Sequence, residues 1–124
     1  MDNNSDKIYD VIILGAGISG LGMAHNLLKE KKSSFAILER NEGVGGTWRE
    51  NTYPGLCCDV PSHFYSFSFA MNPDWSKTYP EQYEILDYLE NIKVKIKDRL
   101  SRNVDFIIVK KVPIDGIILY KKEK

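Results

Sequence analysis

The sequence predicts an α/β fold that begins with a strand, a helix and a second strand parallel to the first. Residues 9–14 (YDVIIL) are nearly all apolar, which is typical of a central strand buried on both faces of a parallel sheet. This run leads directly into a glycine-rich turn, GAGISG, at 15–20. Apolar residues then recur at helical spacing over 21–28, so we expect a helix that ends within 29–34. The next apolar run, FAIL at 35–38, predicts the second buried strand.

The rest of the chain alternates loops with one helix and a short terminal hairpin. Residues 80–92 carry apolar side chains at positions i, i+3, i+4 and i+7, which predicts an amphipathic helix. Residues 104–109 and 117–120 are typical of strands, and Asp115-Gly116 between them suits a two-residue hairpin turn. The intervening loops are glycine-rich at 41–46, form a turn at 52–55, and are aromatic and irregular at 60–75.

Length and charge limit the architecture and the class of partner. The 124 residues suffice for one domain or part of one, and 43% hydrophobic residues are typical of a globular chain. The net charge of zero disfavours nucleic acid and anionic membranes as partners. The charge is uneven, however, at −6 over residues 1–92 and +6 over 93–124. We therefore expect a disordered tail at 1–7, a folded portion at 8–92 and a divergent basic segment at 93–124, with a helix end and a solvated hairpin.

Location and metal content follow from the first residues and from the cysteines and histidines. Polar residues precede the first apolar run, so we expect neither a signal peptide nor a membrane-spanning helix, and a cytoplasmic location. The adjacent Cys57 and Cys58 can neither close a loop nor provide the spacing of a zinc site. His25 and His63 are isolated, so we expect no metal.

The glycine turn has the pattern GxGxxG between a strand and a helix, which is typical of a dinucleotide-binding site. Gly15 permits the tight turn, Gly17 lets the backbone approach a pyrophosphate, and Gly20 allows close packing of the helix. Glu39 follows Gly20 by 19 residues, at the end of the next strand, where its carboxylate can accept hydrogen bonds from ribose hydroxyls. An acidic residue there disfavours a ribose phosphate. The residues predict a Rossmann-like FAD/NAD(P)-binding fold, whose first site holds the ADP part of FAD or NAD rather than NADP.

Four further motifs follow the second strand: GGTW at 45–48, YPG at 53–55, CD at 58–59 and YSFSF at 65–69. This set, from Tyr9 to about Glu90, resembles the flavin-dependent monooxygenases, and among them the Baeyer–Villiger monooxygenases. Disulfide reductases share the first turn but have a CxxxxC pair, which Cys57-Cys58 does not supply. Amine oxidases usually continue the second glycine loop into arginine, where this chain has Thr47-Trp48.

The resemblance implies FAD held at its pyrophosphate by the glycine turn and at its ribose by Glu39, with Arg40 beside the adenine. Asp59 matches a position near the isoalloxazine and nicotinamide rings, where it is the candidate catalytic residue as an electrostatic neighbour. Its alternative role is to cap the Val60-Pro61 turn. Trp48 and the aromatic residues of 64–69 either contact the cofactor or only fill the core. The implied cofactor-binding residues are Gly15, Gly17, Ile18, Ser19, Gly20, Glu39, Arg40, Gly46, Thr47, Trp48, Asp59 and Tyr65.

Members of the family that the chain resembles use NADPH and dioxygen to oxygenate a ketone or a soft heteroatom in a small organic molecule. They are several times longer and carry a second glycine turn for NADPH and a motif of the form FxGxxxHxxxW, and these 124 residues contain neither. We therefore interpret the chain as the FAD-binding amino-terminal part of a flavin monooxygenase, inactive by itself. The alternative is a stand-alone, non-catalytic remnant that binds FAD or an adenine nucleotide. No pattern indicates an oligomeric state.

Overall fold

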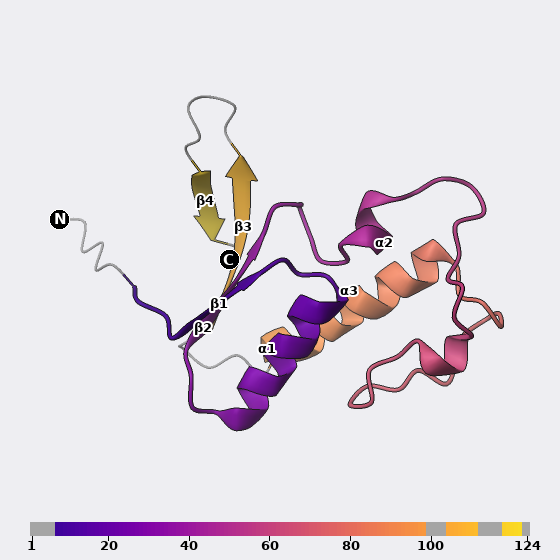
Figure 1. The fold of residues 1–124 in the computed structure, drawn as a ribbon, viewed down its shortest axis with the longest axis horizontal. Helices are drawn as coiled ribbons and strands as arrows, with labels where there is room; N and C mark the ends of the chain where they lie inside the picture. The colour runs from indigo at the N-terminus through magenta and orange to yellow at the C-terminus, as the bar shows by residue number, and fades with distance from the viewer. Residues whose placement is uncertain (1–6, 99–103, 112–117, 123–124) are drawn as a thin grey trace.

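The computed structural model describes residues 7–98, 104–111 and 118–122, and it places them in two layers, a sheet and the helices on one of its faces (Figure 1). The sheet has the order β1 (Val11–Leu14), β2 (Phe35–Glu39), β3 (Val104–Lys111) and β4 (Ile118–Lys122). The first three strands are parallel, and β4 is antiparallel to β3. Most of the tail expected at 1–7 and the Asp115-Gly116 turn lie outside the described residues.

The expected strand, helix and strand unit is present at the start of the chain. Helix α1 (Ile18–Glu30) connects the parallel strands β1 and β2, and it buries Leu21 and Ala24 against the sheet. Its C-cap is Lys31, which has the left-handed φ of 56° and donates its backbone N–H to the Leu27 carbonyl at 3.1 Å. The predicted helix and its end within 29–34 are therefore confirmed.

A long crossover connects β2 to β3 and contains the remaining helices. It includes α2 (Thr47–Glu50), the short 3-10 helix η1 (Ser62–Phe64) and α3 (Gln82–Asp98). The periodicity over 80–92 correctly predicted α3, which begins at Gln82 and ends at Asp98, in agreement with the helix end expected within 93–124. The predicted turn at 52–55 is present, with the Leu56 N–H bonded to the Tyr53 carbonyl at 3.2 Å.

The core lies between the helical layer and one face of the sheet. Ile13, Ile37 and Phe106 lie at paired positions of β1, β2 and β3, and they belong to one buried cluster with residues of α1 and α3. Helix α3 contributes Ile85, Leu89, Ile92 and Ile96 to this cluster. Burial of one such large side chain stabilises the fold by about 1.5–3 kcal/mol relative to its exposure.

The basic segment joins the sheet through β3. β3 pairs with β2 from Phe35 opposite Val104 to Glu39 opposite Ile108, and Phe106 is 5% exposed. A solvated hairpin was expected here, and β3 and β4 do pair antiparallel. β3 also pairs in parallel with β2, which places Phe106 in the core. The neighbouring Asp105 is also buried, and its carboxylate accepts hydrogen bonds from Lys7 and Tyr9. Burial and this carboxylate raise the pKa of Tyr9 to about 12.

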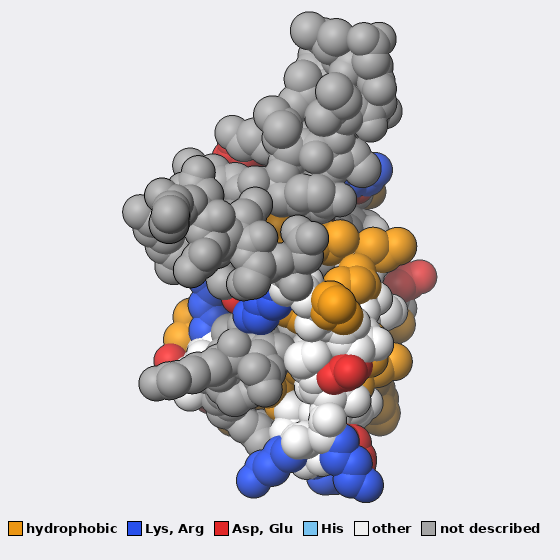
Figure 2. Space-filling view, turned by 90° about the vertical axis from the view of Figure 1, so that its left-hand side faces the viewer, with side chains coloured by type: hydrophobic (Ala, Val, Ile, Leu, Met, Phe, Trp, Pro, Cys, Tyr) orange, Lys and Arg blue, Asp and Glu red, His pale blue; other side chains and the backbone are white. Residues whose placement is uncertain are grey.

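The expectation that the first strand is central and buried on both faces is wrong for this chain. β1 is at the edge of the sheet, and Ile12 and Leu14 are 47% and 81% exposed. Side chains alternate along a strand, so these two point away from Ile13 and from the helices that cover it. No described helix covers the opposite face, and a view from the left-hand side of Figure 1 shows hydrophobic side chains at the surface beside charged ones (Figure 2).

The described helices were compared with the length and apolar character that a membrane-spanning helix needs. No helix within residues 7–98, which contain all the described helical segments, combines the length and the apolar character needed to span a membrane.

Candidate cofactor-binding site

Two glycines of the first turn are required by the geometry of the chain itself. Gly15 has a φ of +97°, and its N–H donates to the Leu38 carbonyl of β2 at 2.7 Å. A Cβ on Gly20 would lie 1.9 Å from the Gly15 carbonyl oxygen, a distance that no side chain can occupy. Gly15 therefore makes the turn possible, and Gly20 lets α1 begin against it.

Gly17 differs, because the protein itself has room for a side chain there. Its φ of −79° and ψ of −166° are extended values open to any residue. A Cβ would lie 3.7 Å from the Gly46 Cα, which is ordinary van der Waals contact. The effect of a methyl group at Gly17 on a bound ligand is therefore separable from its effect on folding.

The N-terminus of α1 presents backbone N–H groups at this turn. Gly17 is the N-cap and provides no side-chain cap, and the first intrahelical hydrogen bond runs from the Leu21 N–H to the Gly17 carbonyl at 3.0 Å. The N–H groups of Ile18, Ser19 and Gly20 precede that bond and have no acceptor within the helix. Together with the positive end of the helix dipole, they suit the negative charge of a pyrophosphate.

Glu39 lies at the end of β2 with its carboxylate fixed beside the turn. The side chain is 5% exposed, and its two oxygens accept the backbone N–H groups of Ala16 at 2.7 Å and Asn41 at 2.9 Å. An ionised carboxylate has about four acceptor positions, so capacity for two ribose hydroxyls remains. Sequence reasoning missed Ala16 and Asn41, because a backbone N–H donor leaves no trace in residue type.

The second glycine loop packs directly against the first. The Gly45 N–H donates to the Ala16 carbonyl at 3.0 Å. Gly46 has a φ of +52°, and a Cβ there would lie 3.3 Å from the Gly17 Cα. Helix α2 starts at Thr47 immediately after this approach. The structure thus brings the GxGxxG turn, Glu39 and the GGTW motif into one site.

Trp48 and Tyr65 join the aromatic segment to this loop. The Trp48 indole N–H donates to the Tyr65 hydroxyl at 2.9 Å, and the two rings meet edge to face with centroids 5.9 Å apart. Trp48 is buried, and burial raises the pKa of Tyr65. Trp48 therefore packs in the core, while its hydrogen bond fixes Tyr65 on the side of the site formed by α2.

The remaining two candidates are exposed. Arg40 donates to the Glu50 carboxylate at 2.7 Å, and this guanidinium lowers the pKa of Glu50. Asp59 lies at the surface, and no described backbone N–H of the Val60-Pro61 turn donates to it. The Val60 N–H instead donates to the Cys58 sulfur at 3.4 Å. The turn-cap alternative for Asp59 therefore lacks the hydrogen bond that it needs.

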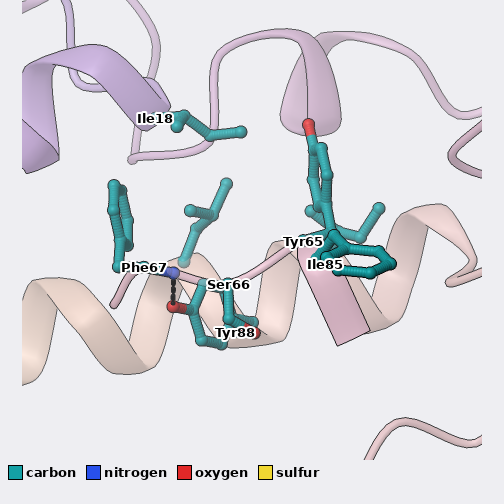
Figure 3. A pocket seen from close by; sticks show the side chains of 8 residues that line it. Ile18, Tyr65, Ser66, Phe67, Ile85 and Tyr88 are labelled. Atoms are coloured by element: carbon teal, nitrogen blue, oxygen red, sulfur yellow. Dashed lines mark hydrogen bonds between the residues drawn. The ribbon is translucent and has the colours of Figure 1, made fainter. Parts of the chain in front are cut away.

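A pocket of about 160 Å³ lies beside the start of α1, between Ile18, the aromatic segment and α3 (Figure 3). Tyr65, Phe67 and Ile85 give it mostly apolar walls. The Tyr88 hydroxyl accepts the Phe67 N–H at 2.8 Å, the hydrogen bond drawn in Figure 3, and donates to the Ala70 carbonyl at 2.8 Å. The aromatic segment is thus attached to α3 by its main chain.

The fold and the glycine turn together define a dinucleotide-binding α/β domain. A model of the NAD(P)-binding Rossmann-like domain matches residues 13–82, and the chain belongs to this family.

Relatives of known class include Baeyer–Villiger and FAD-binding monooxygenases. A Baeyer–Villiger monooxygenase of Streptomyces coelicolor is 54% identical over 82 residues, which are 66% of this chain and 16% of that protein. An FAD-binding monooxygenase of Botryotinia fuckeliana is 41% identical over 122 residues, 96% of this chain and 23% of that protein. Among solved structures, an oxidised steroid monooxygenase bound to NADP matches with a TM-score of 0.69 and 35% identity, covering 93% of this chain and 23% of that one.

The resemblance to Baeyer–Villiger monooxygenases is therefore confirmed, and the chain spans 16–23% of the lengths of these relatives. The Botryotinia alignment includes nearly the whole chain, so it continues past residue 92, where the motif resemblance ends. The division into a folded portion at 8–92 and a divergent segment at 93–124 stays a prediction.

Proposed function

We propose that this chain is the FAD-binding amino-terminal part of a flavin-dependent monooxygenase that uses NADPH and dioxygen to oxygenate a ketone or soft heteroatom of a small organic molecule. One observation carries the proposal: the two glycine loops approach each other at Gly17 and Gly46, beside the buried carboxylate of Glu39. The monooxygenase relatives support it. The small organic substrate and the cytoplasmic location belong to the same proposal.

The residues present fit FAD. The N–H groups at the start of α1 would bind the pyrophosphate, Glu39 would accept the ribose hydroxyls, and Arg40 would lie beside the adenine. Thr47 and Tyr65 would lie on the flavin side, the buried Trp48 would hold Tyr65 there through its indole N–H, and Asp59 would be the exposed carboxylate near the flavin. FAD, when bound, supplies redox and oxygen-transfer chemistry, while these residues bind and orient it.

The second glycine loop favours FAD over NAD as the ligand of this site. It packs on the first turn through the Gly45–Ala16 hydrogen bond and carries the GGTW motif of the monooxygenase resemblance. The 124 residues hold one GxGxxG turn, so NADPH binding requires residues of a longer protein. A non-catalytic FAD-binding remnant remains the alternative, and it makes the same prediction for FAD binding.

The test is FAD binding by the purified chain, measured by equilibrium dialysis. We expect the Gly17→Ala substitution to weaken FAD binding at least about tenfold by blocking approach of the pyrophosphate. Its melting temperature is expected to stay near that of the unsubstituted chain, because the methyl group meets nothing closer than 3.7 Å.

Met23→Ala is the matched control, because Met23 is half exposed on the same helix and outside the site. This variant is expected to bind FAD as the unsubstituted chain does. A folded chain that does not bind FAD, or a Gly17→Ala variant that binds it unchanged, contradicts the proposal.

A further inference from the structure

One stripe of α3 contacts the second glycine loop and the helix α2 that follows it at three points. Gln82, Leu86 and Glu90 are four residues apart and therefore lie along one side of the helix. The Gln82 side-chain amide donates to the Trp48 carbonyl, and Glu90 accepts a hydrogen bond from Arg49. The Leu86 side chain reaches within 2.7 Å of the point where a Cβ on Gly45 would stand.

Arg49 connects this stripe to the main chain of the loop. Its Nε donates to the Val44 carbonyl at 2.6 Å, while its Nη2 donates to the Glu90 carboxylate. The guanidinium lies over Gly43, where a Cβ would stand 2.7 Å from the Arg49 Cζ. Arg49 and Glu90 are 29% and 39% exposed, so their charge-assisted hydrogen bond is partly shielded from water.

The part of the second glycine loop that Arg49 contacts leads directly into the proposed cofactor site. Val44 and Gly45 precede Gly46, which meets Gly17, and the Gly45 N–H bonds to the turn before α1. Glycine backbones lose more conformational freedom on ordering than any others. A loop with glycines at 43, 45 and 46 therefore needs contacts from outside to keep one conformation.

We propose that Arg49 and Glu90 are a positioning pair that holds the second glycine loop in its FAD-binding conformation and so sets the affinity for FAD without touching it. This inference rests on the proposed function. Arg49 acts through the Val44 carbonyl, and Glu90 acts by orienting Arg49. Preorganisation of the loop spares FAD binding the cost of ordering it.

The test compares Glu90→Gln with Asp87→Asn in the chain. Both substitutions remove one negative charge from α3, but Asp87 is exposed and has no described contact with the loop. Glu90→Gln is expected to weaken FAD binding about tenfold and to speed amide exchange over 43–46 without FAD. Asp87→Asn is expected to change neither, and both variants to keep the melting temperature within a few degrees.

Two further variants separate positioning from simple loss of charge. Arg49→Lys keeps the charge but not the forked donors, so we expect intermediate FAD affinity. Glu90→Gln added to Arg49→Met is expected to weaken binding no more than Arg49→Met alone, because the two act as one unit.

The two proposals fail in distinguishable ways. If the unsubstituted chain binds FAD and Glu90→Gln binds it as tightly as Asp87→Asn, the positioning role is wrong and the proposed function stands. If the folded, unsubstituted chain does not bind FAD, the proposed function fails. Amide exchange over 43–46 then still tests whether Arg49 and Glu90 hold the loop. Faster exchange in Glu90→Gln but not in Asp87→Asn supports this role, and equal exchange in the two variants contradicts it.

Discussion

Single residues of the proposed FAD site also stabilise the fold. The Glu39 carboxylate accepts the N–H groups of Ala16 and Asn41, so it ties the first turn to the end of β2 before any ribose binds. At position 20 the fold itself requires glycine, because a Cβ would collide with the Gly15 carbonyl oxygen. At position 17 the fold has room for a Cβ. Gly17 and Asp59 are therefore the positions where a substitution reports on function with little change in stability.

Asp59 offers a test of the candidate catalytic role in the longer protein that we propose. Asp59→Ala is expected to retain FAD and to lose oxygenation, with NADPH consumption diverted to hydrogen peroxide, because the carboxylate no longer acts near the flavin and nicotinamide. The ratio of product formed to NADPH consumed measures this coupling.

The melting temperature separates this role from a structural one. Asp59 is exposed and does not cap its turn, so stability is expected to change by no more than about 0.5 kcal/mol. Asp74→Ala changes another exposed loop carboxylate and is the control, which is expected to keep normal coupling. Normal coupling in a destabilised Asp59→Ala protein means that Asp59 is structural.

Among the helices, strands and turns, the sequence correctly predicted those that a local residue pattern determines. The glycine turn, α1, β2, α3 and the position of Glu39 all follow from spacing within a few tens of residues. The four-residue α2 was missed, because one helical turn is too short for periodicity. The Arg49–Glu90 pair was also missed, because its partners are 41 residues apart and only the crossover brings them together.

The junction of the first turn with α1 gives a prediction about stability. Gly20→Ala places a methyl group 1.9 Å from the Gly15 carbonyl oxygen. Alanine is favoured over glycine in a helix by about 1 kcal/mol, but overpacking of this kind costs about 1–3 kcal/mol or more. We therefore expect net destabilisation, measured as a lower urea midpoint.

Gly17→Ala is the internal control for that measurement, because its methyl group has room. It is expected to leave the midpoint nearly unchanged. Equal midpoints for the two variants mean that the turn relaxes around Gly20 and that close packing there is not required.

For the whole molecule, the main departure from the sequence-based expectation is the sheet face that carries Ile12 and Leu14, which the described helices leave uncovered. The apolar run at 9–14 has the composition of a strand buried on both faces, yet β1 is at an edge and the described helices cover one face only. Burial on the second face depends on neighbours that no local pattern within the 124 residues supplies, so the prediction failed there. The chain spans 16–23% of its relatives' lengths, which agrees with a sheet that is incomplete on that side.

This exposed face predicts limited solubility for the chain alone. An edge strand with unpaired backbone groups and exposed apolar side chains is a site for self-association, and a lysine on it blocks pairing. Leu14 is 81% exposed, so Leu14→Lys removes little buried apolar surface. We expect it to raise several-fold the protein concentration at which light scattering appears. Met23→Lys is the matched control, since it adds the same charge to a half-exposed position on α1. If both variants raise the solubility limit equally, net charge and not the β1 face limits it, and the interpretation of this face is wrong.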